Sequence, residues 1–482
     1  MARAIVNAHA VARVRGGHPW IFKSDIERLD QAAPGGLVQV EDQRGKVWGS
    51  ALYSSASQIA LRMVATSAVE AEKYPDLLRY RIRQAITYRE RVVREADAFR
   101  VLFSEADITP GLIVDKYNDI ISFQVQTQAM DAAFAREILI EELKAAYKPE
   151  TILERVDPRI REMEGLAARE DQAVYSRLKK AKTATIFHIN GLAFHYDGSA
   201  GQKTGAFLDQ RENYGAAERY ARGRALEICT YQGGFALHLN RVCEQVTAVY
   251  ISAEALAVAE RNREMNGQKA IEFVEADAFE LMRQYSDGER RYETIVLDPP
   301  AFAKSKKSAE DALRGYKELN LRALKMLSPG GTLATCSCSH HVGMEEFIGV
   351  VRSAAEDAGR HVQAENSAIC GLGNLNIVVP GFIENRLQAI AIQLHLRGGP
   401  AAEEQGGRRL AGNQLDVETR ELRRDCSIGD RHRHAWSLGD RDLVGEYAAD
   451  GLVEEASVIE PLRFHRVRID FEHGEMLNAK DR

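Results

Sequence analysis

Short apolar runs alternate with longer amphipathic stretches over residues 195 to about 360. Apolar runs near residues 225, 246, 271, 294 and 332 predict strands, and the segments between them carry helical patterns. A chain that alternates strands and helices in this way usually builds parallel strands joined by crossover helices. This part of the sequence therefore predicts an α/β domain with a parallel, doubly wound sheet.

The preceding residues predict two smaller domains and a connector. Two short strands with a turn between them lie within 35–53, and residues 70–95 are strongly helical and charged. Further along, strands at 120–126 and 151–155 flank a helix at 130–147. We therefore expect a small β domain at 1–68, a helical connector at 69–100, an α+β middle domain at 101–194 and the α/β domain at 195–398.

The chain changes character near Gln363. From there to Arg482 it holds many Arg residues, several His residues and a single Lys, Lys480. Residues 387–396 alternate well enough for a strand, but beyond Gly398 little hydrophobic periodicity remains. We expect residues 399–482 to form an atypical, disordered tail.

The composition indicates a globular protein but does not indicate what it binds. The chain has 482 residues, of which 45% are hydrophobic and 28% are charged, as in globular domains, and a net charge of −6 gives no global signal for nucleic acid. The N-terminus lacks the apolar core of a signal peptide, and no run approaches a membrane span. Six scattered cysteines do not form a disulfide framework, so we expect a cytoplasmic location.

A Gly-Gly turn follows the first strand of the α/β domain. The strand at 225–229 runs into Gly233-Gly234 and then into a helix, which brings backbone close to a small cofactor. The spacing is not G-x-G-x-x-G, so a dinucleotide-binding fingerprint is disfavoured. Later strands end near Asp277, at Asp298 with its two prolines, and at a Cys-Ser-Cys string. This order of motifs strengthens the case for a cofactor site.

The Cys-Ser-Cys string at 336–338 offers two candidate thiols. A C-x-C pair without a second Cys or His pair is a poor zinc site, and although His340 and His341 follow, we assign no metal. Cys338 would lie at the end of a strand, on the cleft side of an open sheet. The alternative is that Cys336 and Cys338 are small buried residues of the strand end.

With these motifs in place, residues 1 to about 360 resemble the bacterial ribosomal RNA large-subunit methyltransferase I family. The Gln-Lys-Thr-Gly and Thr-Cys-Ser-Cys-Ser strings carry most of the specificity. The matching stretches are RGGHPWIF at 15–22, EAD at 105–107, PGLIVD at 110–115, GQKTGAFLDQR at 201–211, LDPP at 297–300 and TCSCSHH at 335–341.

The resemblance implies a fold and an activity. It implies an N-terminal RNA-binding PUA domain, a small middle domain and a Rossmann-like class I methyltransferase domain that uses S-adenosylmethionine. The implied reaction forms 5-methylcytosine in large-subunit ribosomal RNA, a step of rRNA processing. An RNA guanine N-methyltransferase and a catalytically silent RNA-binding protein are the alternatives. Ribosomal RNA is the implied partner, and whether the protein forms a homodimer is left open.

The resemblance also assigns the chemistry. Cytosine C5 is a poor nucleophile, and enzymes that methylate it add a Cys thiolate to C6. Cys338 is the implied nucleophile, with Cys336 the less favoured thiol. Asp298 would hold the N3 edge of the base, or would serve only as a helix cap or turn residue. Phe302 would stack on the base.

Cofactor contacts follow from the same comparison. Glu227 stands where the family pattern has Asp, and Tyr250 where it has an acidic residue that binds the ribose, so Glu254 is an alternative ribose ligand. The expected cofactor-binding residues are Gln202, Lys203, Thr204, Gly205, Phe207, Asp209, Glu227, Gly233, Gly234, Tyr250, Ser252, Asp277, Ala278 and Asp298.

A basic and aromatic cluster marks the N-terminal domain. Arg13, Arg15, His18 and Trp20 look like the RNA-facing edge of a PUA domain, because such a cluster suits phosphate contact and base stacking. Trp20 as an ordinary core residue is the alternative. In the α/β domain, Lys304 is expected to meet RNA phosphates, unless its loop is simply solvated.

Overall fold

The computed structural model describes most of the chain up to residue 362. The described ranges are 2–199, 206–288, 290–303, 308–339, 341–360 and 362, together with the backbone of 388–393. The predicted tail at 399–482 lies outside them. None of the helices that the structure describes combines the length and the apolar content that a membrane crossing requires.

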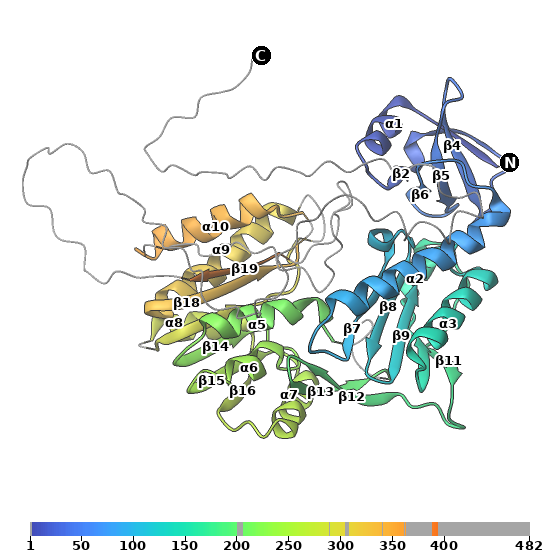
Figure 1. Ribbon diagram of the computed structural model, residues 1–482. Coiled ribbons are helices and arrows are strands. Elements are labelled where there is room, and N and C mark those ends of the chain that lie inside the picture. The colour runs from blue at the N-terminus through green and yellow to red at the C-terminus, as the bar shows by residue number, and fades with distance from the viewer. Residues whose placement is uncertain are drawn as a thin grey trace, which may run out of the picture. The chain divides into compact units, whose positions relative to one another are not determined.

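The N-terminal domain is a six-stranded sheet in the order β2-β6-β5-β4-β1-β3 (Figure 1). Alternate residues of β4 point inward, so that Val38 and Val40 join Ile21 and Leu61 in one core. Asn7 caps the domain's helix by accepting a hydrogen bond from the Ala10 amide. The elements are β1 (Arg3–Val6), α1 (Ala8–Arg15), β2 (Trp20–Phe22), β3 (Ile26–Asp30), β4 (Leu37–Asp42), β5 (Val47–Tyr53) and β6 (Ile59–Ala65).

The predicted connector is one long helix, α2 (Tyr74–Val92), packed against α3 of the middle domain. Its buried residues, among them Leu78, Ile82 and Ile86, recur every four positions and form one apolar stripe. The middle sheet has the order β11-β10-β9-β8-β7. Its elements are β7 (Ala98–Phe103), β8 (Leu112–Tyr117), β9 (Ile120–Val125), α3 (Ala133–Tyr147), β10 (Thr151–Glu154), α4 (Pro158–Met163) and β11 (Gln172–Ser176).

A hairpin of β12 (Ala184–Ile189) and β13 (Leu192–Asp197) follows the middle sheet. Its Phe187 and Phe194 belong to the same hydrophobic core as Tyr214 and Ala225 of the α/β domain. The expected boundary at residue 194 therefore falls inside β13. We propose that the α/β domain begins before β12, because the hairpin buries its apolar side chains there.

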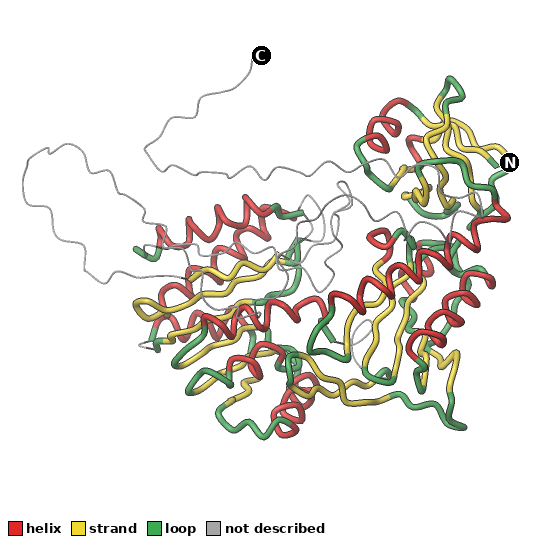
Figure 2. The backbone as a smooth tube through the Cα atoms, viewed as in Figure 1, coloured by secondary structure: helices red, strands yellow, loops and turns green. Residues whose placement is uncertain are grey.

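The α/β domain contains the predicted parallel sheet, whose strands are yellow in Figure 2. The strand order is β16-β15-β14-β17-β18-β19. All neighbouring strands run parallel except β19, which pairs antiparallel with β18. The elements are α5 (Arg211–Tyr220), β14 (Arg224–Ile228), α6 (Gly234–Leu239), β15 (Gln245–Tyr250), α7 (Ala253–Met265), β16 (Ile271–Glu275), α8 (Ala278–Asp287), β17 (Tyr292–Leu297), α9 (Ala309–Met326), β18 (Leu327–Ser337), α10 (Met344–Asp357) and β19 (Gln388–Gln393).

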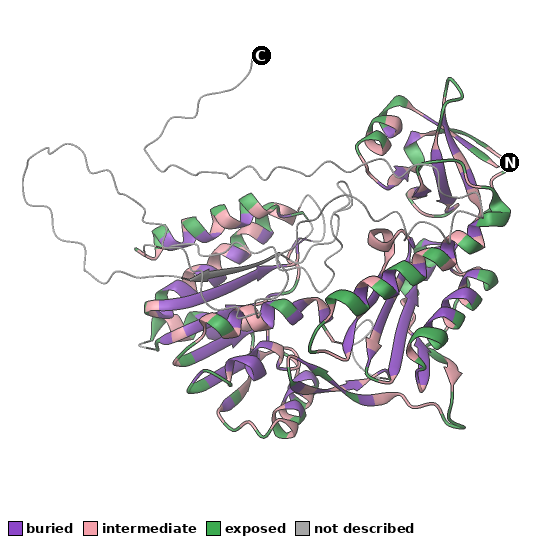
Figure 3. Ribbon diagram, in the orientation of Figure 1, coloured by how far each residue is buried: buried purple, intermediate pink, exposed green. Residues whose placement is uncertain are grey.

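The central strands of this sheet are buried on both faces, as their purple ribbons show (Figure 3), whereas the edge strand β16 is partly exposed. Val296 of β17 belongs to one hydrophobic core, whereas its neighbours Ile295 and Leu297 belong to the core on the other face. Strands covered on both sides read as continuous apolar runs, which is why the sequence pattern located them. The chain reverses direction across the sheet between β14 and β17, and ligands of open α/β sheets bind at such a switch point.

Candidate active site

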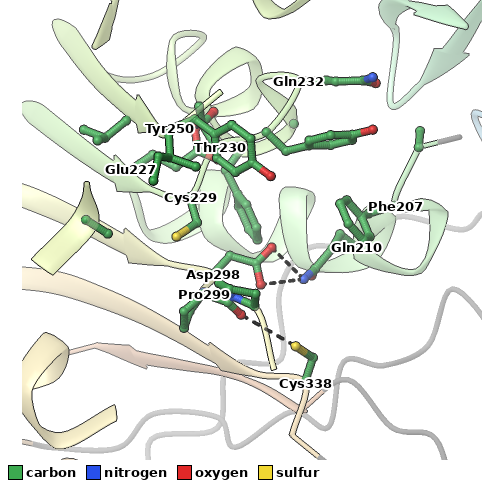
Figure 4. Close-up of a pocket in the computed structure, with 18 of the residues that line it drawn as sticks. Phe207, Gln210, Glu227, Cys229, Thr230, Gln232, Tyr250, Asp298, Pro299 and Cys338 are labelled. Carbon is green, nitrogen blue, oxygen red and sulfur yellow. Dashed lines mark hydrogen bonds between the residues drawn. The ribbon is translucent and has the colours of Figure 1, made fainter. Parts of the chain in front are cut away.

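A cavity of about 360 Å³ lies at the carboxyl ends of β14, β15 and β17, close to the end of β18. Its size is in the range of small-molecule sites in proteins. The turn after β14, the end of β15, the Asp298-Pro299-Pro300 loop and Cys338 all contribute to its wall (Figure 4). The strand ends that the sequence singled out therefore meet around one space.

The turn after β14 has an unusual backbone. Cys229, Tyr231 and Gly233 have φ angles of 71°, 53° and 85°, which lie in the left-handed region that costs non-glycine residues roughly 1–2 kcal/mol. The amides of Cys229 and Thr230 both donate to the Val249 carbonyl of β15, at 2.9 and 3.0 Å. These bonds tie the turn to the neighbouring strand, and the turn's side chains line the cavity.

Gly234 is needed for packing rather than for flexibility. A Cβ atom at Gly234 would lie 2.3 Å from the hydroxyl of Tyr214, whose ring is buried. That ring packs edge-on against Phe235 and stacks on His238. The second glycine of the predicted turn thus lets α5 and α6 approach closely.

Two buried carboxyl groups line the cavity. The pKa of Glu227 is raised to about 8, chiefly by burial; a hydrogen bond from the Thr230 hydroxyl opposes the rise, and the charge on Asp298 contributes to it. Burial likewise raises the pKa of Asp298 to about 7, with the charge of Asp209 adding to the effect. No Lys or Arg is among the described residues that line the cavity. The wall therefore suits a ligand that brings positive charge.

Aromatic rings form the side of the cavity next to β15. Tyr250 and Tyr231 meet edge-on at an interplanar angle of 69° with centroids 5.8 Å apart, and the centroids of Phe207 and Tyr231 lie 5.1 Å apart. All three line the cavity. Glu254, the alternative ribose ligand, is exposed and accepts a hydrogen bond from Ser252 at 2.7 Å, and it does not line the cavity. Tyr250, rather than Glu254, therefore stands in the wall near the end of β15.

Two of the predicted cofactor residues act as helix caps. Asp277 lines the cavity, yet its carboxylate also accepts a hydrogen bond from the Glu280 amide at 3.0 Å and caps α8. Ser252 caps α7 by accepting from the Ala255 amide, and it does not line the cavity. Capping engages only part of the Asp277 carboxylate, which has lone pairs left for a ligand.

The two thiols of the Cys-Ser-Cys string differ in environment. Cys336 is 3% exposed within the hydrophobic core, and its thiol hydrogen-bonds Asp298. Cys338 lines the cavity, and its thiol lies 3.6 Å from the Pro299 carbonyl oxygen. Between the two candidates, Cys338 is the one whose sulfur faces the ligand space.

Ser339, directly after this string, holds the loop that follows Asp298. Its hydroxyl oxygen accepts hydrogen bonds from the amides of Phe302 and Ala303, both at 3.1 Å, and lies 2.8 Å from the Tyr316 hydroxyl. Ser339 itself is 3% exposed. The end of β18 thus fixes the Asp-Pro-Pro loop and places Phe302 in the cavity wall.

The predicted RNA-facing residues of the N-terminal domain are mostly engaged in contacts. Arg13 pairs with the buried Asp25 and lies over the Phe22 ring. The Trp20 indole N–H donates to Glu105 of the middle domain at 2.9 Å, and the His18 ring accepts from the Trp20 amide. Arg15 is exposed. Trp20 is therefore a contact to the middle domain, so the cluster offers RNA less surface than its sequence indicated.

The cavity contains most, but not all, of the predicted cofactor-binding residues that the structure describes. Those that line it are Phe207, Glu227, Gly234, Tyr250, Asp277, Ala278 and Asp298, whereas Asp209, Gly233 and Ser252 do not. The predictions for Gln202, Lys203, Thr204, Gly205 and Lys304 lie outside the described residues.

The lining residues that were not predicted include Gln210, Cys229, Thr230 and Tyr231. Gln210 lies inside the GAFLDQR string that carried part of the resemblance, so the string contained a usable signal. The other three follow the first strand of the α/β domain directly, where the chain enters the switch point.

Comparison with known proteins finds two matching family models. A PUA-like domain model matches residues 4–66, and a model of S-adenosylmethionine-dependent methyltransferases matches residues 170–367. A protein from Streptococcus mutans described as a SAM-dependent methyltransferase has a TM-score of 0.64 at 17% identity, and the match covers 82% of this chain and 100% of that one. This structural likeness supports the fold.

Sequence relatives identify the family. Ribosomal RNA large subunit methyltransferase I of Klebsiella pneumoniae (strain 342) is 36% identical over 353 residues, which cover 72% of this chain and 87% of the relative. Its namesake in Tolumonas auensis is 36% identical, with 72% and 88% covered. The chain therefore belongs to the ribosomal RNA large subunit methyltransferase I family of S-adenosylmethionine-dependent enzymes.

Proposed function

We propose that this enzyme methylates C5 of a cytosine in large-subunit ribosomal RNA through a thiolate of Cys338. The observation that carries the proposal is that Cys338 and Asp298 line the same cavity, from the ends of the adjacent strands β18 and β17. A methyltransferase acting on a nitrogen atom would not need the thiol, because nitrogen already offers a lone pair. A Cys that lines the site therefore favours carbon methylation.

The cavity fits the cofactor by charge and by shape. S-adenosylmethionine, when bound, supplies the methyl group as part of a sulfonium cation. Glu227 and Asp298 offer buried carboxyl groups to a cation, and no basic residue of the described lining opposes them. Tyr231, Tyr250 and Phe207 would pack against an adenosine group.

Cys338 would act as the nucleophile. Its thiolate would add to C6 of cytosine and place an electron pair on C5, which would take the methyl group that the cofactor's sulfonium supplies. Transfer of the C5 proton to a water molecule would then let the electron pair of the C5–H bond restore the double bond and expel the thiolate. The contact between the Cys338 sulfur and the Pro299 carbonyl holds the thiol beside the Asp-Pro-Pro loop.

Asp298 would serve the base from the opposite side. A carboxyl group with a pKa of about 7 can give or take a proton near neutral pH, which is the property that a general acid at cytosine N3 requires. Proton donation to N3 withdraws electrons from the ring and makes C6 a better target for the thiolate. Phe302, in the same wall, would stack on the base.

Trapping with 5-fluorocytosine tests the proposal. Large-subunit rRNA transcribed with 5-fluorocytidine is incubated with the full chain and S-adenosylmethionine, because fluorine at C5 cannot leave as a proton and the Cys–RNA adduct persists. We expect a covalent band on a denaturing gel. Cys338→Ala should abolish the band and lower methyl transfer to ordinary rRNA by at least ~10³-fold.

Cys336→Ala is the matched control, since it removes a neighbouring thiol of the same strand end. It should keep the band and most of the methyl transfer. If the two variants exchange results, Cys336 is the nucleophile. Methyl transfer to rRNA by the wild type with no adduct at all would replace the proposal by nitrogen methylation, and an enzyme that neither binds cofactor nor transfers methyl would be a silent RNA-binding protein.

A further inference from the structure

Gln210, which the sequence did not single out as a site residue, donates hydrogen bonds to the carboxyl group of Asp298. We propose that Gln210 is a positioning residue that acts through Asp298. Its role would be to hold both carboxylate oxygens of Asp298 in place by donating hydrogen bonds to them. The inference rests on the proposed function only in naming Asp298 as the group that meets the base.

The contact is bidentate and buried. The Gln210 side-chain nitrogen lies 3.0 Å from each of the two Asp298 carboxylate oxygens (Figure 4). Gln210 is only 2% exposed, although it lines the cavity. A single amide group that spans both oxygens fixes the plane of the carboxylate, because rotation about the side-chain bond would break one of the two contacts.

Asn213 determines which way the Gln210 amide faces. The Asn213 side-chain N–H₂ donates to the Gln210 side-chain oxygen, and Asn213 is itself 4% exposed. With its oxygen occupied by a donor, Gln210 must turn its own N–H₂ toward Asp298. The relay from Asn213 through Gln210 therefore delivers N–H donors to the carboxylate, and donors favour its charged form.

The segment that carries Gln210 is anchored by the middle domain. Gln210 ends a short 3₁₀ turn, Leu208–Gln210, immediately before α5. Upstream of the turn, the Ala206 amide donates to the Tyr117 hydroxyl of β8 at 3.1 Å. Tyr117 is fully buried and stacks on Tyr196 with centroids 3.9 Å apart. Gln210 is thus attached to a rigid support on the side away from Asp298.

A consequence is that the ionisation of Asp298 depends on Gln210. Burial favours the neutral acid, whereas the two N–H contacts favour the carboxylate. Gln210→Met keeps the length of the side chain but removes the donors, so Asp298 should take up its proton at higher pH. The shift should be about one pH unit, the size expected when hydrogen bonds to a buried carboxylate are lost.

Cofactor affinity measured against pH gives a readout that needs no chemistry. A cationic ligand binds more tightly to the ionised cavity, so the affinity for S-adenosylmethionine should rise with pH through the titrations of Asp298 and Glu227, and only the Asp298 part of the rise should depend on Gln210. Calorimetric titration of the full chain between pH 5.5 and 9 should show this rise about one unit higher in Gln210→Met than in the wild type. In an Asp298→Asn background, Gln210→Met should cause no further shift.

Two further variants provide an independent test and a control. Asn213→Ala frees the Gln210 amide to turn, and it should move the same rise upward by a smaller amount even if Gln210→Met folds poorly. Gln232→Leu removes a side-chain amide that lines the cavity without an interaction to Asp298, and it should leave the position of the rise unchanged. An unshifted rise in both Gln210→Met and Asn213→Ala would overturn the proposal and leave Gln210 as a packing residue.

The same series separates this inference from the proposed function. If the affinity rise shifts as expected but 5-fluorocytosine RNA gives no adduct, cytosine methylation fails and the Gln210–Asp298 coupling stands. If the adduct forms through Cys338 but the rise does not shift, the coupling fails and the proposed reaction stands. In the pH profile of single-turnover methyl transfer, the limb due to Asp298 should shift together with the affinity rise.

Discussion

Replacement of Glu227 by Gln should make the enzyme more stable at alkaline pH. Glu227 is 1% exposed at the end of β14 and accepts a hydrogen bond from the Thr230 hydroxyl at 2.6 Å. The oxygen of a Gln side chain can accept the same bond, and it carries no charge to bury. The substitution therefore removes the electrostatic cost of the carboxylate while it preserves most of the local packing.

The size of the effect follows from the two pKa values. The ordinary pKa of Glu is 4.5, and burial raises that of Glu227 to about 8. Between these values the folded protein keeps a proton that the unfolded chain has released, so the contribution of Glu227 to stability is highest below 4.5 and falls as the pH rises to about 8. At about 1.4 kcal/mol for each unit of difference, the loss between pH 5.5 and 8.5 is roughly 3 kcal/mol.

Urea unfolding of the ligand-free full chain at several pH values measures this difference. Circular dichroism is a better signal than tryptophan fluorescence, because Trp20 and Trp48 report on the N-terminal domain. Between pH 5.5 and 8.5 the free energy of unfolding of the variant should rise by roughly 3 kcal/mol relative to that of the wild type. This corresponds to roughly 6–12 °C in melting temperature for a domain of this size.

Glu275→Gln is the matched control, since Glu275 is an exposed carboxyl group at the end of β16 in the same sheet. The free energy of unfolding of this control should change with pH in the same way as that of the wild type. A Glu227→Gln variant that also runs parallel to the wild type would refute the reasoning, because it would mean that water reaches Glu227 and that its burial does not penalise the charge.

Two further predictions concern the cavity wall. Tyr250→Asp should restore an acidic ribose ligand and tighten S-adenosylmethionine binding by ~1.5–3 kcal/mol, the value of a hydrogen bond to a charged group, in a calorimetric titration. Glu254→Ala should leave that affinity unchanged, since Glu254 does not line the cavity; weaker binding in both variants would show that Tyr250 packs and Glu254 binds. Ser339→Ala should leave the amides of Phe302 and Ala303 without their hydrogen-bond acceptor, lower the free energy of unfolding by on the order of 2 kcal/mol and slow methyl transfer. Ser328→Ala is the control for a lost hydroxyl in β18, because the Ser328 hydroxyl is part-buried and contacts Glu293.

The sequence by itself determined the framework of the α/β domain. Five apolar runs and the helical patterns between them located β14 to β18, because strands buried on both faces need hydrophobic residues at almost every position. The alternation at 387–396 also predicted a strand, and the backbone of β19 pairs with β18 there. The parallel order then placed Glu227, Asp298 and Cys338 at one edge of the sheet, since the carboxyl ends of parallel strands coincide.

Only the tertiary structure decided which residues face the cavity and what each one contacts. Gln210 and Asp298 are 88 positions apart, and Trp20 and Glu105 are 85 apart, so no local periodicity could pair them. Ser252 lies next to the strand end but caps a helix, while Cys229 and Tyr231 reach the wall through a left-handed turn that no propensity indicates. Hydrophobic pattern fixes secondary structure because it is local, whereas the orientation of polar side chains depends on partners that only folding brings together.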